Sequence, residues 1–181
     1  MMFMIGDKVV YPSQGACLID SVVKKTIAGN PTSFYRLSLL DDRCDAVLVP
    51  VEKLTALHVR HLLAKSEIPK LLSHLKNSAT AAKKWRQRAV DNAKLLSSGS
   101  AFDLAEIVES LTDLSEAKPL LPRDRQTLEK ARKFLICEIS EVMEESRSAA
   151  EAQIDEALKN KKEGTRIEPG MRTSVPVPAL V

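Results

Sequence analysis

Basic side chains gather around the one tryptophan of this 181-residue sequence. The segment 81–98, which opens AAKKWRQRAV, has one acid, Asp91, and five cations: Lys83, Lys84, Arg86, Arg88 and Lys94. Its net charge of +4 exceeds the +3 of the whole chain. Such a set suits a polyanion, because cations neutralise phosphates while an aromatic ring stacks on bases or inserts between them. Nucleic-acid binding is therefore one interpretation of this segment.

Periodicity offers a second interpretation of Trp85. If the segment 81–98 is helical, Trp85 falls on one apolar stripe with Ala82, Ala89, Ala93 and Leu96. An aromatic residue on such a stripe is usually packed in a core, and a run of charges is often only a solvated face. Yet the stripe near Trp85 consists of alanines, and a tryptophan in the first turn or two could overhang a bundle. The pattern alone leaves both interpretations open.

The sequence contains no recognisable catalytic motif: no glycine-rich phosphate loop, no His-Glu-x-x-His and no nucleophile signature. His58 and His61 are three residues apart and could share a helix face, with His74 beyond them. No cysteine or carboxylate completes a metal-ligand spacing with these histidines. We expect no enzyme, no metal and no cofactor, and we retain a small metal-dependent enzyme built on the three histidines as an alternative.

Composition and cysteine usage indicate a cytoplasmic globular protein. The sequence is 44% hydrophobic, which is enough to bury a core, and the net charge is too small to argue for nucleic acid by itself. Cys17, Cys44 and Cys137 are odd in number and far apart, as expected of reduced thiols packed as small apolar residues. The apolar opening 1–5 is too short for a signal peptide or a membrane span.

The first third of the sequence consists of short apolar runs separated by turn signals, a pattern typical of short strands. Turn signals such as Pro12-Ser-Gln-Gly15 separate four apolar runs, and Leu37 and Leu39 alternate with polar residues as in a half-buried strand. The predicted strands are 8–11, 16–27, 33–39 and 46–49. Four or five strands in so short a segment predict a small, highly curved antiparallel barrel over residues 1–52. A connector over 53–65 follows.

Helical signals dominate the remainder of the sequence. Ser66 and Glu67 cap a helix that has Pro69 in its first turn, and Gly99 ends the helix over 81–98. Ser100, with Asp103 three residues later, begins the next helix, and Pro122 suits the first position of the longest one. A short helix over 148–158 completes a helical domain of residues 66–158, and 159–181 is predicted to be a flexible tail. The fold class is thus α+β.

Taken together, these motifs resemble the CarD/CdnL family of bacterial transcription regulators. The resemblance covers roughly residues 3–158 and rests on these stretches: FMIGDKVVYP at 3–12 with Gly15, Phe34-Tyr35, Val49-Pro50, Trp85 followed by basic residues, Asn92, Leu96-Ser-Ser-Gly99 and Leu128-Glu-Lys-Ala-Arg132. The opening motif is shared with the polymerase-interaction domain of the transcription-repair coupling factor. Only the basic tryptophan helix with Ser-Gly is specific to the regulators.

The resemblance implies a fold and a mechanism. It implies a Tudor-like first domain that docks on the β subunit of RNA polymerase, and a helical domain that reaches promoter DNA at the upstream edge of the transcription bubble. The tryptophan would act as a minor-groove wedge that stabilises the open complex, without reading a specific base sequence. We expect a monomer that does not associate with membranes.

Residue by residue, Trp85 matches the wedge and Arg88 matches a basic neighbour in the family pattern. Lys83, Lys84, Arg86 and Lys94 are added as DNA-binding candidates because of their charge. On the polymerase side Lys25 matches a basic residue of the family, but Leu48 stands where relatives carry a second one. Either Arg43 substitutes from the preceding loop or this surface is more apolar. Val90 also replaces a residue that is basic in some relatives.

The alternative function is a protein-interaction adaptor without direct DNA binding. In that case the barrel binds polymerase or another protein, the helices bind protein, and the cations of 81–98 are only solvated.

Overall fold

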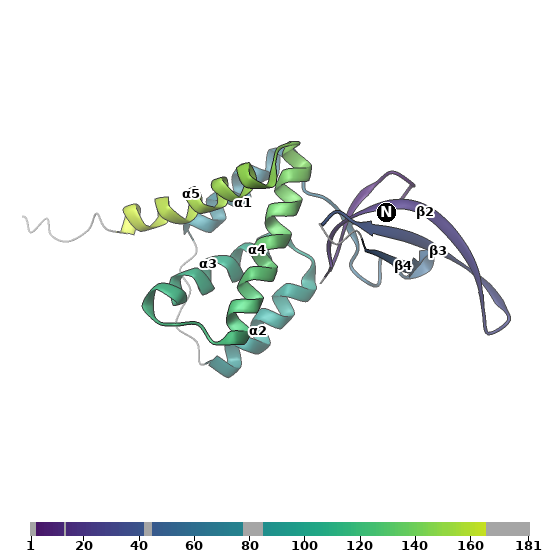
Figure 1. Ribbon diagram of the computed structural model, residues 1–181, viewed down its shortest axis with the longest axis horizontal. Helices are drawn as coiled ribbons and strands as arrows, with labels where there is room; N and C mark the ends of the chain where they lie inside the picture. The colour runs from purple at the N-terminus through teal and green to yellow at the C-terminus, as the bar shows by residue number, and fades with distance from the viewer. Residues whose placement is uncertain (1–2, 13, 42–44, 78–84, 166–181) are drawn as a thin grey trace, which may run out of the picture.

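A curved antiparallel sheet lies beside a group of helices (Figure 1). The computed structural model describes residues 3–12, 14–41, 45–77 and 85–165. Side chains are described as far as residue 160, except those of Asn77 and Trp85. The α+β class and the order predicted from the sequence, strands first and helices second, are confirmed.

The sheet has five strands within the described residues, in the order β4-β3-β2-β1-β5, and every neighbouring pair is antiparallel. Their bounds are β1 Lys8–Tyr11, β2 Gly15–Ile27, β3 Asn30–Leu39, β4 Ala46–Pro50 and β5 Arg60–His61. The first four agree with the predicted runs. The sequence did not indicate β5, which lies in the predicted connector, because two residues are too few to show a period. The sheet therefore extends beyond residue 52.

Alternation along β3 builds the core of the sheet. Leu37 and Leu39 are buried, whereas Arg36 before them is exposed and Ser38 between them is half-buried, as the period of two predicted. The hydroxyl of Tyr35 on the inner face donates to the carbonyl of Phe3 at 2.7 Å. Leu54 and Val59 close this core from the segment between β4 and β5, after a short 3-10 turn at Val51–Lys53.

Five α-helices follow within the described part of the chain: α1 Ile68–Asn77, α2 Trp85–Ser98, α3 Ala101–Ala117, α4 Pro122–Met143 and α5 Arg147–Thr165. A 3-10 turn at Lys65–Glu67 precedes α1. Two predicted helix starts are confirmed: the Ser100 hydroxyl accepts from the Asp103 amide at 3.4 Å, and Pro122 occupies the first turn of α4. Of the predicted Ser66-Glu67 cap, it is Glu67 that makes the capping bond, since its carboxylate accepts from the Ala64 amide at 2.9 Å. The last helix is longer than the predicted 148–158, since α5 continues to Thr165.

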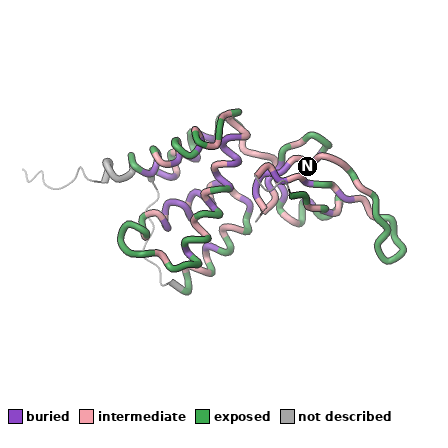
Figure 2. Tube along the Cα trace, viewed as in Figure 1, coloured by how far each residue is buried: buried purple, intermediate pink, exposed green. Residues whose placement is uncertain are grey.

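Apolar stripes on α1, α3, α4 and α5 meet in the helical core. Leu71, Ile107, Leu135 and Ile154 represent the four helices there, and each is fully buried. Figure 2 shows this burial along the inner sides of the helices, in contrast to the exposed tip of the ribbon formed by β2 and β3. The core fixes the helices against which α2 packs.

The cysteines that the structure describes are buried thiols. Burial raises the pKa of Cys17 to about 12 and that of Cys137 to about 11, so both remain protonated near neutral pH. Cys44 lies outside the described residues. None of the helices in the described segments is long and apolar enough to cross a membrane.

Candidate nucleic-acid and polymerase interfaces

The solvent side of α2 carries a stripe of two cations with an apolar residue between them. Arg86, Val90 and Lys94 follow one another at four-residue spacing, so they share one face of the helix. All three are exposed, and Val90 is 52% exposed. We name these three residues the outer stripe of α2. Long basic side chains on an exposed stripe can reach a phosphate backbone.

The packed side of α2 differs from the predicted one. It consists of Arg88, Asn92, Leu95 and Leu96, whereas Ala93, which was expected on the apolar stripe, is exposed. Asn92 is only 6% exposed. The prediction was right for Leu96 and wrong for Ala93, because it ranked residues by hydrophobicity and two inward positions of this helix are polar. Ala82, another expected member of the stripe, lies outside the described residues.

Arg88 joins α2 to the first turn of α4. A guanidinium nitrogen of Arg88 lies 2.7 Å from a carboxylate oxygen of Asp124, and the two side chains are only 13% and 6% exposed. An ion pair so shielded from water interacts more strongly than a surface pair, and each charge needs the other. Arg88, a predicted DNA contact, therefore also has a structural partner inside the helical domain.

The remaining DNA-binding candidates come at or just before the first residue of the same helix in the sequence. Trp85 is the first residue of α2, and its side chain is not described. Lys83 and Lys84 precede the helix and lie outside the described residues. The structure thus brings Arg86 and Lys94 together on one face and places Arg88 on another.

The sheet places two polymerase-side candidates on one face. Lys25 pairs with Thr32 and Leu48 pairs with Arg36. Opposed residues of an antiparallel pair point to the same side, and so do residues four apart on one strand. Lys25 and Leu48 therefore share the face opposite the Leu37 core, and both are exposed. Arg43, the third candidate, lies outside the described residues.

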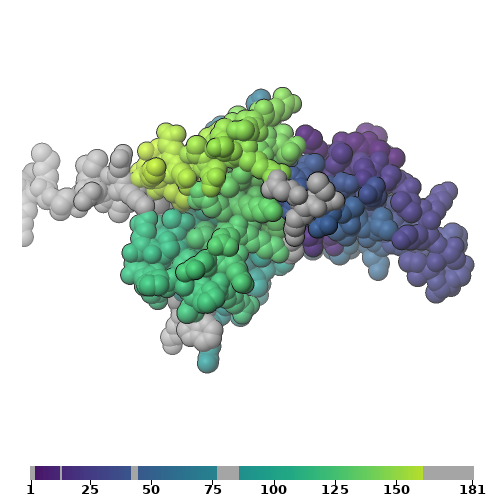
Figure 3. Space-filling model, viewed as in Figure 1, coloured from purple at the N-terminus to yellow at the C-terminus, as the bar shows by residue number. Residues whose placement is uncertain are grey.

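This outer face of the sheet contains an ordered polar group. The carboxylate of Asp20 accepts hydrogen bonds from the hydroxyls of Ser21 and Ser38, which lower its pKa, and the Arg36 guanidinium lies 3.4 Å away. β4 lies at the margin of the sheet, with Leu48 36% exposed. The ribbon of β2 and β3 projects past β4 and β1, as the space-filling view shows at one end of the molecule (Figure 3).

The three histidines do not form a common site. The ring of His61 packs on Phe3 at 5.0 Å, whereas the ring of His74 meets Phe102 edge-on at 5.8 Å in the helical core region. His58 is exposed in a turn with a positive φ of 56°. Among the described residues, no group of three potential metal ligands comes together.

Sequence reasoning missed a charged cluster between the sheet and the helices. Arg60 of β5 makes two hydrogen bonds to the carboxylate of Glu138 on α4, at 2.7 and 3.0 Å, and its Nε donates to the Gly99 carbonyl at 2.7 Å. The available signal was an acid, Glu138, directly before Ile139 in the apolar stripe of α4. We call Arg60, Glu138 and Gly99 the interdomain cluster.

Comparison with known sequences assigns both halves of the chain. The sequence profile of the "CarD-like/TRCF RID domain" matches residues 3–63, and that of the "CarD, C-terminal domain" matches residues 70–155. The chain belongs to the CarD/CdnL family. Among curated relatives, the Bacillus subtilis (strain 168) protein named "Putative transcription factor YdeB" is 27% identical over 141 residues, which cover 76% of this chain and 90% of that protein.

Family membership agrees with the architecture. The five-stranded sheet is consistent with a Tudor-like interaction domain, and the sheet-first, helices-second order is that of the two matched domains. CarD/CdnL proteins form a class of transcription factors and are not a family of enzymes. A role in the regulation of transcription, with polymerase interaction through the first domain, is therefore supported.

Proposed function

We propose that this CarD/CdnL protein binds the RNA polymerase β subunit through the outer face of its sheet and promoter DNA through α2, and that it stabilises the open complex. The observation that carries the DNA half is the outer stripe of α2, where Arg86 and Lys94 are exposed on the helix that begins at Trp85. The family assignment supports the polymerase half.

On the DNA side, the residues divide into a wedge, phosphate contacts and a support. Trp85 is the wedge, which enters the minor groove at a base step that melting has already loosened. Arg86 and Lys94, with Lys83 and Lys84 ahead of the helix, contact the phosphates on either side. Arg88 contributes as a support through the pair with Asp124, which holds α2 on the bundle.

On the polymerase side, the surface combines basic, apolar and edge-strand features. Lys25 supplies the charge, and Leu48 supplies an apolar contact on β4. Arg36 lies between them on the same face, paired with Asp20. The exposure of Leu48 supports the more apolar of the two docking modes considered above, and Arg43 remains a candidate from the neighbouring loop.

The proposed mechanism requires only differential affinity. A wedge that inserts at an opened step binds melted promoter DNA better than closed duplex, so it shifts the equilibrium between these states. Docking on polymerase holds the wedge at the edge of the bubble and raises its effective concentration there. No reaction is catalysed, and the effect grows with the difference in affinity between the two states.

Replacement of the wedge tests this function. Trp85→Ala is expected to shorten the lifetime of the open complex at least fivefold on a pre-melted promoter fork, a loss of about 1 kcal/mol or more from one stacking contact. Pull-down with the β subunit and the circular dichroism spectrum should stay unchanged. Trp85→Phe, which keeps an apolar ring, serves as the matched control and should lose less.

Two outcomes would contradict the proposal. Global unfolding of both tryptophan variants would make Trp85 a core residue instead of a wedge. Binding of the chain to forked DNA that is absent, or unaffected by salt, even with polymerase present would favour the adaptor function.

A further inference from the structure

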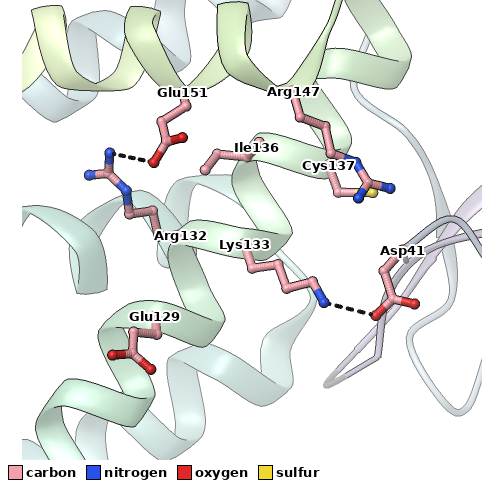
Figure 4. A pocket seen from close by; sticks show the side chains of 8 residues that line it. All are labelled: Asp41, Glu129, Arg132, Lys133, Ile136, Cys137, Arg147 and Glu151. Atoms are coloured by element: carbon pink, nitrogen blue, oxygen red, sulfur yellow. Dashed lines mark hydrogen bonds and ion pairs between the residues drawn. The ribbon is translucent and has the colours of Figure 1, made fainter. Parts of the chain in front are cut away.

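The sheet and the helices share a boundary that a flexible pair of domains would lack. At its rim, Lys8 of β1 pairs with Glu141 of α4 at 2.8 Å. A second rim pair, which Figure 4 draws, joins Lys133 of α4 to Asp41 at 3.3 Å. These lysine side chains are 46% and 45% exposed, so water screens both pairs at the lysine end, although the Asp41 side chain is only 8% exposed. The rim contacts alone do not explain a fixed arrangement.

The interdomain cluster occupies the middle of the boundary and is shielded from water. The Glu138 side chain is 3% exposed and that of Arg60 is 25% exposed. Besides the two bonds from Arg60, Glu138 accepts a hydrogen bond from the Leu63 amide at 3.0 Å, in the segment that leads from β5 to α1. A bidentate pair between a guanidinium and a carboxylate restricts both the distance and the angle between the two groups, unlike an ion pair made by a lysine. Its geometry therefore defines one orientation of β5 on α4.

Two glycines let the domains approach closely at the same boundary. A Cβ on Gly99, which has φ of +77°, would lie 2.8 Å from Cγ of Pro12 in the turn between β1 and β2. A Cβ on Gly15, with φ of +95°, would lie 2.8 Å from the ring of Phe134 on α4. Side chains at these positions would force the sheet away from the helices. The contact is thus direct, backbone against side chain.

The position of Gly99 links this boundary to the wedge helix. Gly99 directly follows Ser98, the last residue of α2, and its carbonyl accepts from Arg60. The sheet consequently holds one end of α2, and Trp85 is at the other end, about 20 Å away at 1.5 Å per residue. A tilt of about 10° at the Gly99 end would move the Trp85 end by about 3.5 Å, about the spacing of stacked bases.

We infer that Arg60 and Glu138 are positioning residues that fix the direction of α2 relative to the sheet, so that docking of the sheet on polymerase also sets where Trp85 meets the DNA. This inference rests on the proposed function for its consequence but not for its geometry. Neither residue contacts polymerase or DNA in this scheme. Their effect is exerted through the orientation of two binding surfaces.

The experiment measures orientation and function in the same variants of the full chain. For Glu138→Ala, residual dipolar couplings should report a changed or averaged orientation of sheet and helices. Affinity for isolated β subunit and for forked DNA should each stay within about twofold, because neither surface is altered. The open complex should nevertheless decay about tenfold faster, because the two sites no longer engage together.

Three further variants grade the effect. Glu138→Gln keeps the acceptor for Leu63 but loses the charge, and Arg60→Lys keeps the charge but lacks the fork that reaches both Glu138 and Gly99. Both should give intermediate lifetimes, and they keep the test available if Glu138→Ala does not fold. Glu141→Gln, which removes an exposed pair from the same helix and boundary, is the matched control and should leave orientation and lifetime unchanged.

Distinct outcomes would overturn the inference and the proposed function. Folded variants with the parental orientation would overturn the inference, as would a loss of β or DNA affinity that accounts for the shorter lifetime, since the role would then be merely structural. An unchanged lifetime for Trp85→Ala would instead remove the wedge function. The orientation measurement needs neither polymerase nor DNA, so it decides the positioning role in either case.

Discussion

The cations on the outer stripe of α2 and Arg88 on the packed side of the same helix differ in their surroundings. Arg86 and Lys94 face water, whereas Arg88, two residues after Arg86, is 13% exposed and lies 2.7 Å from Asp124. An exposed charge keeps its hydration, so it can be exchanged for a ligand phosphate at little cost to the fold. A buried charge has given up hydration and depends on its partner.

The comparison shows that the same residue type serves recognition on one face of α2 and architecture on the other. Charge content alone cannot distinguish the two roles, since the segment 81–98 reads as uniformly basic. The interdomain cluster repeats the second role at larger scale, where Arg60 and Glu138 hold two domains instead of two helices. Substitutions on the two faces should therefore affect different measurements.

The largest expected effect on stability follows from breaking the Arg88–Asp124 pair. Asp124→Asn leaves the Arg88 charge shielded from water without its counterion, and we expect a loss of about 3 kcal/mol in the free energy of unfolding. Urea denaturation with an unchanged m-value measures it. Lys94→Met, which removes a charge from the exposed face of the same helix, should alter stability by less than about 0.5 kcal/mol.

A double substitution then separates structure from DNA contact at Arg88. Arg88→Met with Asp124→Leu removes both charges and should recover most of the lost stability. If Arg88 only supports α2, affinity for forked DNA should recover with stability. A variant that is stable but still weak in DNA binding would make Arg88 a direct phosphate contact as well.

Hydrophobic periodicity and local caps predicted most of the strands and helices, because these elements bury their apolar residues at regular spacing. Leu37 and Leu39 are inside as the alternation required, and Ser100 caps α3 through a contact three residues away in sequence. Such local signals need no knowledge of the partner element. The boundary of α5 was predicted too early, since the polar residues after Leu158 still propagate a helix that packing has already nucleated.

The parts that escaped prediction depend on distant partners. Glu138 pairs with a residue 78 positions away, and Arg88 with one 36 positions away, so neither pairing leaves a local pattern. The buried side of α2 was misplaced for the same reason, because Arg88 and Asn92 count as surface residues by type. Of the candidate site, the charge on α2 was predictable, but its division into two faces was not.

The next largest effect concerns DNA affinity and its dependence on salt. Each cation that neutralises a phosphate contributes about 0.9 to the slope of log K against log salt on duplex DNA. Replacing Arg86 and Lys94 together by glutamine should therefore weaken binding and flatten the slope by about 2. Lys70→Gln, an exposed lysine of α1, is the matched control and should leave the slope unchanged.

Val90 allows the salt dependence of DNA binding to be tested by adding a charge instead of removing one. It lies between the two cations of the outer stripe and is exposed, so Val90→Lys adds a charge without disturbing packing. The variant should bind DNA more tightly at low salt, with a slope steeper by about 1. A slope that ignores both the removal and the addition of charge would mean that the stripe does not face phosphates.

The smallest expected effect lies on the polymerase face and depends on pH. Hydrogen bonds from Ser21 and Ser38 lower the pKa of Asp20 below its ordinary 3.8. A carboxyl whose folded pKa is depressed adds stability above its unfolded pKa, and this contribution disappears as the pH falls through the folded value.

Ser38→Ala should raise the pKa of Asp20 in an NMR titration and slightly lower the urea midpoint near neutral pH. The substitution should have less effect on the urea midpoint in strong acid, because a protonated Asp20 gains less stability from the Ser38 hydrogen bond than the carboxylate does. Ser33→Ala on the same strand is the control, and an equal loss at both pH values for Ser38→Ala would assign the effect to packing instead of the carboxylate.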